Sequence, residues 1–187
     1  MTTSNNNFHL VDLQTVIPTI KLDLRYATIN NFTGKKIYSI AQCFLQESAA
    51  LALKQVQEEL ALLGLSLKVF DGYRPLSVQY LFWQLVPDEH YVADPKKGSR
   101  HNRGCAVDVT CVKLDGTEIL MPTDFDDFTE RAHSDYMQLP AEAVKNRALL
   151  RTLMERYGFT VLVTEWWHFD YKGWEQYPVL DIACENL

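Results

Sequence analysis

The chain contains 187 residues, of which 47% are hydrophobic and 22% are charged, and this composition excludes a disordered or fibrous protein. A formal net charge of -6 disfavours a nucleic-acid partner, because phosphate binding requires clustered lysine and arginine side chains. No stretch approaches the roughly 18 apolar residues of a membrane span, and the polar N-terminus lacks the pattern of a signal peptide. We therefore expect one domain over 1–187 that functions in the cytoplasm without a membrane partner, and whose residues 1–8 are flexible.

Alternation, apolar periodicity and turn-forming residues predict three strands and two helices in the first half of the chain. These are edge strands at 11–13 and 20–24, a helix at 46–63, a strand at 65–70 and a helix at 77–85. An apolar stripe with helical spacing supports the first helix, which Gly64 can end. Pro75 is expected to end the strand before it and to start the second helix.

In the second half, we expect a loop at 91–102, strands at 105–112 and 160–163, and a helix at 141–157. Alternation in the first of these strands places Asp108 on a strand, among apolar residues. Helices and strands alternate along the chain, but no glycine-rich phosphate turn follows the strand at 65–70. We therefore predict an α+β fold with a mixed or antiparallel central sheet and helices packed on it.

The four cysteines of the chain are Cys43, Cys105, Cys111 and Cys184. They form no CxxC pair and no dense framework of the kind that disulfide-stabilised domains require. We interpret them as buried free thiols in a reducing compartment.

The first segment with chemical potential runs from Ser99 to Asp108. It offers the imidazole of His101 and, seven residues later, the carboxylate of Asp108, with Gly104 between them to allow a bend. A surface histidine and a structural aspartate would give the same pattern. The position of Asp108 in an apolar strand favours a metal ligand, because a buried carboxylate is costly unless it is paired or bound to metal.

The second segment reads Glu165-Trp166-Trp167-His168 and supplies another carboxylate and another imidazole. In an ideal strand Glu165 and His168 face opposite sides, so the segment must bend, bulge or turn if both reach one metal ion. The alternative is a surface glutamate and a core histidine. We expect the flanking aromatic residues to wall the site and exclude water, namely Trp166, Trp167, Phe169 and Tyr171. Together the two segments provide what a hydrolytic zinc site needs: three protein ligands, an open position for water and a nearby base.

The two segments match the pattern of a known family. The pattern Ser-x-His-x-x-Gly-x-Ala-x-Asp from Ser99, followed by Glu-x-Trp-His from Glu165, resembles the zinc D,D-peptidases that share the fold of the Hedgehog signalling domain. The blocks Asp-Gly-Tyr-Arg-Pro at 71–75 and Phe-Asp-Asp-Phe-Thr-Glu-Arg-Ala-His at 125–133 narrow the resemblance to D-alanyl-D-alanine dipeptidases of the VanX type. All four blocks agree with that family in order and spacing.

The resemblance implies hydrolysis of the small dipeptide D-alanyl-D-alanine to two D-alanines, with one zinc ion per chain. It implies that the zinc ligands are His101, Asp108 and His168, that the general base is Glu165, and that the cation facing the oxyanion is Arg74. It further implies that Ser99 and Asp127 contact the ammonium group of the substrate, and that Asp71 orients Arg74. These residue types suit their roles, because a glutamate can take and return a proton and a buried arginine stabilises an oxyanion.

Other polar residues near these motifs have less specific interpretations. Asp124 and Asp126 are expected to form a solvated acidic turn. His133 lies either beside the site or on the surface, and His9 and His90 are assigned to solvent. The usual state of such side chains in a folded protein is exposure to water.

The sequence departs from the resistance enzymes of this family in two places. Arg100, between Ser99 and His101, adds a bulky cation beside the expected mouth of the site. The segment from Arg74 to His101 is also shorter than in those enzymes. Because this region is expected to border the pocket, the departures concern substrate preference and not the metal ligands.

Three alternative functions stay open at this point. A D,D-carboxypeptidase or peptidoglycan endopeptidase of the same superfamily would use the same site, although such enzymes usually carry an export signal or a wall-binding module. A non-catalytic zinc domain that binds a partner would not need Glu165, because a structural site closes its fourth position. A serine or cysteine hydrolase is disfavoured, because Ser99 and His101 are too close in sequence for a triad and no G-x-S-x-G motif occurs. The sequence does not indicate the oligomeric state or the physiological role.

Overall fold

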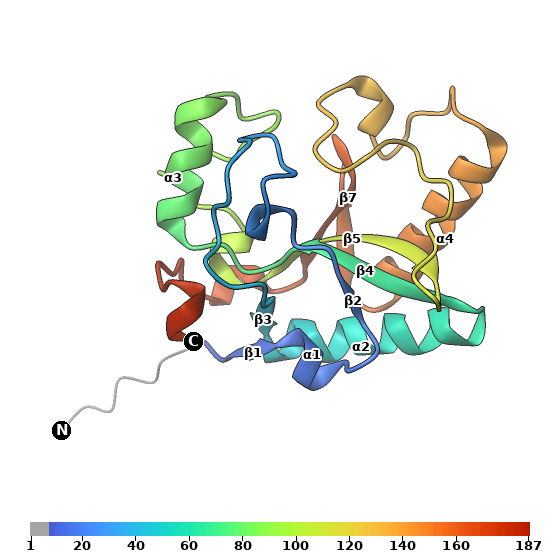
Figure 1. The fold of residues 1–187 in the computed structure, drawn as a ribbon, viewed down its shortest axis with the longest axis horizontal. Helices are drawn as coiled ribbons and strands as arrows, with labels where there is room; N and C mark the ends of the chain where they lie inside the picture. Colours follow the sequence, from blue (N-terminus) through green and yellow to red (C-terminus); the bar gives the residue numbers. More distant parts are fainter. Residues whose placement is uncertain (1–7) are drawn as a thin grey trace.

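The computed structural model describes residues 8–187, so most of the start that we expect to be flexible lies outside the described residues. Its centre is a five-stranded sheet with the order β2-β4-β5-β7-β6 (Figure 1). The strands are β2 (Lys21–Leu22), β4 (Leu65–Asp71), β5 (Ala106–Lys113), β6 (Phe159–Leu162) and β7 (Glu165–Tyr171). Only β2 and β4 pair in parallel, and the other neighbours are antiparallel. The predicted mixed sheet is therefore confirmed.

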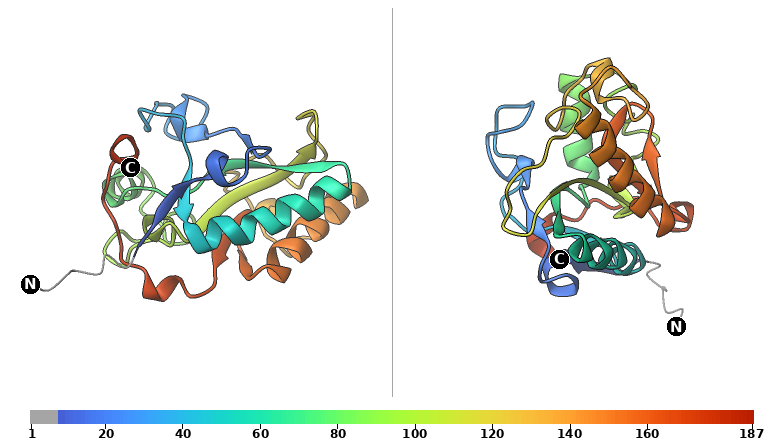
Figure 2. Two further views of the ribbon diagram at one scale, coloured as in Figure 1. Left: turned by 90° about the horizontal axis from the view of Figure 1, so that it is seen from below. Right: turned by 90° about the vertical axis from the view of Figure 1, so that its right-hand side faces the viewer.

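Three longer helices surround the sheet, and all three were expected from the sequence. They are α2 (Glu47–Leu62), α3 (Leu76–Leu85) and α4 (Ala141–Arg156). Helices α2 and α4 lie side by side along one face of the sheet, and α3 lies beyond the end of β4 (Figure 2). Because α2 and α4 each bury one apolar stripe, they cover that face and leave the other to loops.

The N-terminal region differs from expectation. A small second sheet pairs β1 (Leu10–Asp12) with β3 (Phe44–Gln46), and β3 was not predicted. The segment expected as a strand at 11–13 ends at Asp12, because the side chain of Asp12 caps the short helix α1 (Leu13–Val16). Short 3-10 helices occur at Arg25–Ala27, His101–Arg103, Glu130–Ala132, Trp174–Gln176 and Cys184–Asn186.

The core lies between the sheet and the helices and continues through the central strand. All residues of β5 except the last are buried, so both faces of this strand are covered. The largest buried side chains include Trp166, Trp167 and Phe169 of β7. The four cysteines are buried and free, as we interpreted them. The consequence for the site is that Asp108, in the middle of β5, is held in a rigid and dry environment.

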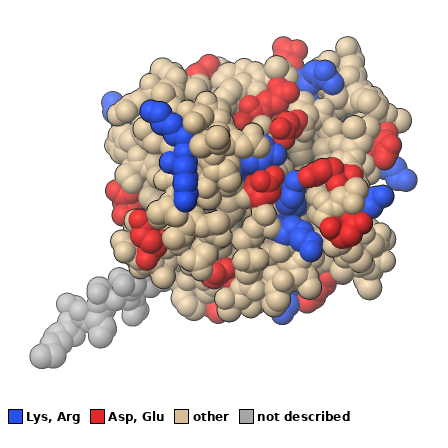
Figure 3. Space-filling model, viewed as in Figure 1, with Lys and Arg blue, Asp and Glu red and all other residues tan. Residues whose placement is uncertain are grey.

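The surface bears charges of both signs. On the face shown in Figure 3, acidic and basic side chains are intermingled. None of the helices in the described part of the chain is long and apolar enough to cross a membrane.

Candidate metal centre and active site

Three adjacent strands bring a row of polar side chains into the interior. Asp108 on β5 is the direct cross-strand partner of His168 on β7 and of Asp71 at the end of β4. Directly opposed residues point to the same face of a sheet, so the three side chains share one face. All three are buried, and nothing but mutual pairing or a ligand can compensate such burial.

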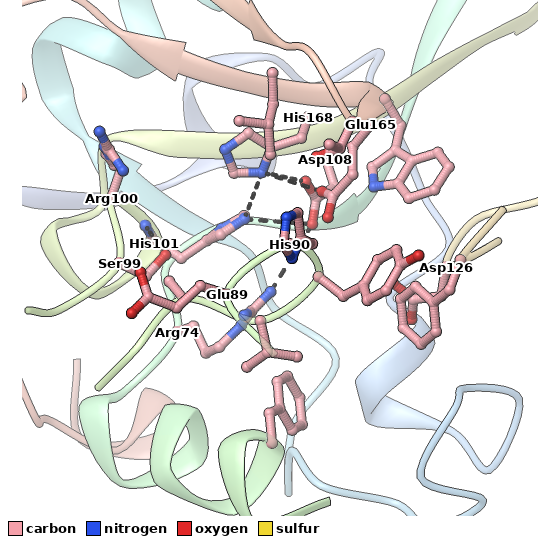
Figure 4. Close-up of a pocket in the computed structure, with 18 of the residues that line it drawn as sticks. Arg74, Glu89, His90, Ser99, Arg100, His101, Asp108, Asp126, Glu165 and His168 are labelled. Atoms are coloured by element: carbon pink, nitrogen blue, oxygen red, sulfur yellow. Dashed lines mark hydrogen bonds and ion pairs between the residues drawn. The ribbon is translucent and has the colours of Figure 1, made fainter. Parts of the chain in front are cut away.

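A bulge in β7 adds Glu165 to this row. Along the β6–β7 pair, Val161 opposes Phe169 but the next residue, Leu162, opposes Glu165, so three residues of β7 are left over. This irregularity places the Glu165 carboxylate 3.9 Å from His168 Nδ1, although the two residues are three apart. The expected departure from an ideal strand is therefore confirmed (Figure 4).

His101 comes from the 3-10 helix that precedes β5. The helix ends at Arg103, and the next residue, Gly104, adopts the left-handed conformation with φ 66° and so turns the chain into the strand. The backbone N–H of His101 donates to Ser99 Oγ over 3.2 Å, and its carbonyl accepts from Arg74 N. These bonds fix the imidazole against the turn that follows β4.

The three expected ligands fit a tetrahedral metal ion. His101 Nε2 lies 3.2 Å from His168 Nδ1 and 3.4 Å from Asp108 Oδ2, and His168 Nδ1 lies 3.0 Å from Asp108 Oδ1. Nitrogen and oxygen ligands of tetrahedral zinc, at about 2.1 Å from the ion, are separated from one another by about 3.4 Å. Each pair of residues thus brings two donor atoms close to the spacing that a zinc ion requires, and one ligand atom from each of the three residues lies within 4.8 Å of the others.

The remaining imidazole nitrogens are both engaged by acceptors. His101 Nδ1 donates to the Gly72 carbonyl over 2.7 Å, and His168 Nε2 lies 3.0 Å from Asp170 Oδ1. Because a carbonyl can only accept, the proton of His101 is on Nδ1 and Nε2 is free for a metal ion. Asp170 likewise accepts the proton of His168 Nε2 and leaves His168 Nδ1 free for a metal ion. The role of Asp170 was not predicted, although a residue two positions along a strand lies on the same face as His168.

The carboxylates and imidazoles of the cluster have strongly shifted pKa values. Burial acts to raise the pKa of Asp108, but His101 and His168 outweigh it and hold that pKa well below its usual range. Burial acts to lower the pKa of His168, but the carboxylates of Asp170 and Asp108 outweigh it and raise that pKa. Burial raises the pKa of Glu165 to about 7. Asp108 is therefore a permanent anion, whereas Glu165 can exchange a proton near neutral pH.

Arg74 lies beside the ligands, as expected, and Asp71 orients it. Its Nε and Nη2 donate to Asp71 Oδ2 over 3.0 and 2.7 Å, and its Nη1 donates to Gln79 Oε1 over 2.9 Å. Tyr38 donates to the other oxygen of Asp71. Arg74 Nη2 also lies 3.9 Å from Asp108 Oδ2. Gln79 and Tyr38 were missed, because nothing local in the sequence connects them to Arg74.

The acidic segment after β5 corrects one expectation. Asp126, which we expected in solvent, lines the pocket and accepts a hydrogen bond of 2.9 Å from Tyr26 Oη. Asp127, expected to contact the substrate, is not part of the pocket lining, and its Oδ1 accepts from Thr129 N. The reason is the backbone at Asp126, whose φ of 59° turns its side chain inward. Asp124 is exposed and pairs with Arg25, as expected for a solvated residue.

Burial also changes the pKa of Asp126. Its partial enclosure, together with the negative charge of Asp108, raises that pKa well above the usual range of an aspartate. A raised pKa favours the neutral form of the carboxyl group, and a cation that comes close to it favours the ionised form. Tyr26 was also missed, since it lies far from the motifs in sequence.

Ser99 and the remaining histidines differ in whether they line the pocket. Ser99 lines the pocket, but Figure 4 shows it on the opposite side of the ligands from Asp126. His90 borders the same pocket and is 81% exposed. His133 and His9 are not part of the lining.

The pocket above the ligands has a volume of about 310 Å³ and combines polar and aromatic walls. Of the four aromatic residues expected to wall the site, only Trp167 does so, while Trp166 and Phe169 belong to the core. The pocket is lined by other aromatic side chains, namely Tyr26, Phe32, Phe82, Tyr91 and Phe128. Phe82 lies on α3 and Tyr26 in the 3-10 helix at Arg25–Ala27, and the other three lie in loops, whose side-chain directions sequence periodicity does not predict.

Comparison with known proteins agrees with this geometry. The family model described as D-ala-D-ala dipeptidase matches residues 6–180. The chain is 40% identical over 171 residues to a D-alanyl-D-alanine dipeptidase of Escherichia coli, covering 91% of this chain and 89% of the relative. It is 33% identical over 180 residues to one of Enterococcus faecalis, covering 85% and 89%.

A solved structure of a vancomycin resistance D,D-dipeptidase in complex with a D-Ala-D-Ala phosphinate analog is 17% identical, with a TM-score of 0.46. The match covers 87% of this chain and 66% of that one. On the strength of the family model and the two relatives, the chain belongs to the D-alanyl-D-alanine dipeptidase family of metallopeptidases.

Proposed function

We propose that this protein is a zinc-dependent dipeptidase that hydrolyses D-alanyl-D-alanine to two molecules of D-alanine. The observation that carries the proposal is the cluster of His101, Asp108 and His168 with the Glu165 carboxylate beside it, in a pocket open to a small substrate. Membership of the family supports the choice of dipeptide. The expected cytoplasmic location stays a prediction.

His101 Nε2, His168 Nδ1 and an oxygen of Asp108 would hold the zinc ion. When bound, zinc lowers the pKa of a water molecule and polarises the scissile carbonyl group. The second nitrogens of both imidazoles donate to fixed acceptors, so the ligands are oriented before the ion binds. A catalytic site needs one position free for water, and the described residues supply only three ligands at this cluster.

Glu165 is the group that moves protons in this proposal. It accepts the proton of the attacking water and donates it to the leaving amino group of the second alanine. Its pKa of about 7, caused by burial, suits both steps near neutral pH. Its side chain is only 14% exposed, so bulk water does not compete for the proton.

Arg74 is the group that stabilises the negative charge on the former carbonyl oxygen. Asp71 and Gln79 hold its guanidinium in place, so it does not have to reorient as charge develops. The guanidinium also lies over the aromatic rings of Phe82 and Tyr26, at 4.8 and 5.4 Å from the ring centroids. This arrangement keeps the cation dry and strengthens its interaction with an oxyanion.

The ammonium group of the dipeptide needs an acceptor within reach of the scissile bond. Asp126, held by Tyr26 Oη, supplies a carboxylate in the wall of the pocket. In this proposal it binds the ammonium group of the substrate, the role that we had expected of Asp127. A charged acceptor of this kind favours substrates with a free amino group over acylated ones.

The test is the release of free D-alanine from D-alanyl-D-alanine by the purified protein, with and without a zinc chelator. L-alanyl-L-alanine and N-acetyl-D-alanyl-D-alanine serve as comparison substrates. Chelator-sensitive cleavage of the free D,D-dipeptide alone is expected. Cleavage of the acetylated substrate would assign the protein to the carboxypeptidases, and no cleavage in the presence of bound zinc would favour a non-catalytic zinc domain.

A further inference from the structure

Arg100 is a cation at the edge of the pocket whose partners do not explain its position. Its Nε is buried and has no hydrogen-bond partner among residues 8–187, and its one ion pair there is with Asp170 Oδ2 at 3.5 Å. Arg74, the other arginine of the pocket lining, donates hydrogen bonds from three nitrogens. A desolvated donor without an acceptor is unfavourable, so an anion that accepts from Arg100 Nε would be bound favourably here.

The guanidinium of Arg100 is nevertheless held in place. Its central carbon lies 4.5 Å from the centroid of the Trp174 ring, and that of Arg103 lies 5.3 Å from the same ring. Stacking on an aromatic face fixes the plane of an arginine while leaving its edge available for hydrogen bonds. The side chain is 43% exposed, so a small solute can reach it from the pocket.

The charged groups of the pocket are separated along one direction. Figure 4 shows Ser99 and Arg100 on one side of the His101–Asp108–His168 cluster and Asp126 on the other. A dipeptide is a zwitterion with its ammonium group at one end and its carboxylate at the other. If Asp126 binds the ammonium group and the scissile bond lies at the cluster, the carboxylate extends towards Ser99 and Arg100.

We propose that Arg100 binds the C-terminal carboxylate of the substrate, with the hydroxyl of Ser99 as a second donor, and thereby selects dipeptides with a free C-terminus. This inference rests on the proposed function. The Ser99 oxygen accepts from His101 N, which leaves its own hydrogen free to donate. A guanidinium suits this role because it forms two parallel hydrogen bonds with a carboxylate.

The acidic side chains near Arg100 do not already fulfil its role. Asp170 directs Oδ1 to His168, and its Oδ2 forms an ion pair of 3.5 Å with Arg100 Nε that is not a hydrogen bond. Glu89, on the same side of the pocket, is paired with Lys97, whose Nζ lies 2.7 Å from it. A substrate carboxylate would therefore meet a cation whose charge is only partly balanced.

The experiment compares D-alanyl-D-alanine with D-alanyl-D-alaninamide, in which a neutral amide replaces the carboxylate. Dissociation constants are measured by calorimetry on the zinc-loaded E165Q protein, which cannot complete hydrolysis, and on the zinc-loaded E165Q/R100Q protein. We expect R100Q to weaken binding of the acid about tenfold, the effect of losing a charge-assisted hydrogen bond at a half-exposed site. Binding of the amide should stay unchanged, and R100K should retain part of the preference for the acid.

Arg103 provides the matched control. It stacks on the same Trp174 ring, but its Nη1 donates to the carbonyl of Tyr177 and it is not part of the pocket lining. E165Q/R103Q should keep the preference for the acid. If E165Q/R100Q binds the acid and the amide equally more weakly, or contains less zinc, Arg100 acts through Asp170 on His168 and the inference is overturned. An unchanged preference of E165Q/R100Q for the acid over the amide would also overturn it. Failure of the proposed function is a separate result, namely no D-alanine release by the unaltered zinc-loaded protein.

Discussion

The carboxyl groups of Asp108 and Glu165 have pKa values shifted in opposite directions, although both belong to the candidate site and share one face of the sheet. Asp108 lies between two imidazoles, and their positive charge outweighs burial and lowers its pKa. Glu165 is farther from the imidazoles, so burial dominates and raises its pKa to about 7. An acid that is always ionised is a good ligand, and an acid that titrates near neutrality is a good proton carrier. Environment alone thus divides the two roles.

The first prediction concerns the proton carrier. Replacing Glu165 by glutamine should lower kcat for D-alanyl-D-alanine by about 10²- to 10⁴-fold, because the amide cannot accept the proton of the attacking water. Zinc content, measured by atomic absorption, should stay at one ion per chain, since Glu165 is not among the three ligands. The variant for comparison is Asp108→Asn, which should lose zinc as well as activity because Asp108 is one of the three proposed ligands. An E165Q protein with normal kcat would exclude Glu165 as the base.

The second prediction concerns the acceptor of the substrate ammonium group. Asp126→Asn should raise KM for D-alanyl-D-alanine by about 10- to 100-fold, because the neutral amide loses a charge-assisted contact with the ammonium group. Asp127→Asn is the matched control, since Asp127 is the next residue but does not line the pocket. Steady-state kinetics of both variants decide the matter. A larger increase of KM for Asp127→Asn than for Asp126→Asn would mean that Asp127 binds the ammonium group, as expected from the sequence.

At the scale of elements, the site depends on two departures from regular structure. The bulge of β7 brings Glu165 and His168 to one metal position. The turn after β4 places the Gly72 carbonyl 2.7 Å from His101 Nδ1. Gly72 is packed tightly, because a Cβ at this position would lie 2.5 Å from Cys43 Sγ and 2.9 Å from the Phe44 carbonyl oxygen. The turn therefore links the packing of β3 to the orientation of a ligand.

The third prediction follows from this tight turn. Gly72→Ala should lower the free energy of unfolding by about 1–3 kcal/mol, because the added methyl group overlaps a backbone oxygen that cannot move freely. It should also weaken zinc binding, because the shifted carbonyl no longer orients His101. Urea unfolding and competition with a chromophoric chelator measure the two effects.

Gly116→Ala separates packing from backbone strain. Gly116 has φ of 90° in a turn with open space around its Cβ position. Its substitution should cost only the strain of the left-handed conformation, about 1–2 kcal/mol, and should leave zinc affinity unchanged. Equal zinc affinities of G72A and the unaltered protein would refute the coupling.

At the scale of the whole molecule, the metal ion would join parts of the chain that are far apart in sequence. The ligands belong to the 3-10 helix at His101–Arg103 and to strands β5 and β7. In the metal-free protein, protonated His168 lies between Asp108 and Asp170. Zinc must displace that proton, because a metal ligand needs its lone pair. Metal affinity and pH are therefore linked.

The fourth prediction is that zinc raises Tm, and more so at higher pH. With free zinc at about 100 times Kd, the native state gains about 2.7 kcal/mol, or roughly 5–10 °C for a chain of this size. The pKa of His168 is raised in the folded metal-free protein, so its contribution to stability is present below its unfolded pKa and is lost as pH rises through the folded value. The difference in Tm between the zinc-loaded and metal-free protein should thus be larger at pH 8 than at pH 6. Scanning calorimetry measures it, and a difference that shrinks with pH would contradict the linkage.

The sequence by itself determined the longer helices, the central strands β4 and β5, and the residues that we propose as metal ligands. Apolar periodicity predicted α2, α3, α4, β4 and β5, because each element buries a face whose spacing is written locally in the chain. Asp108 could be recognised because a carboxylate in a buried strand needs a partner, and the spacing of Glu165 and His168 required the irregularity that β7 contains. The short segments around these residues also matched the motif of a known family.

Only the tertiary structure decided which residues from other parts of the chain complete the pocket. Tyr26, Gln79 and Asp170 reach the site through folding, and the choice between Asp126 and Asp127 depends on one backbone angle. Asp126 lies in a loop, and a loop carries no period from which the direction of a side chain follows. Gln79 and Asp170 lie on α3 and β7, but their partners, Arg74 and His168, follow from the contacts of the folded chain. The residues that we propose as ligands could therefore be chosen from local pattern and family motif, whereas the walls of the pocket were determined by long-range packing.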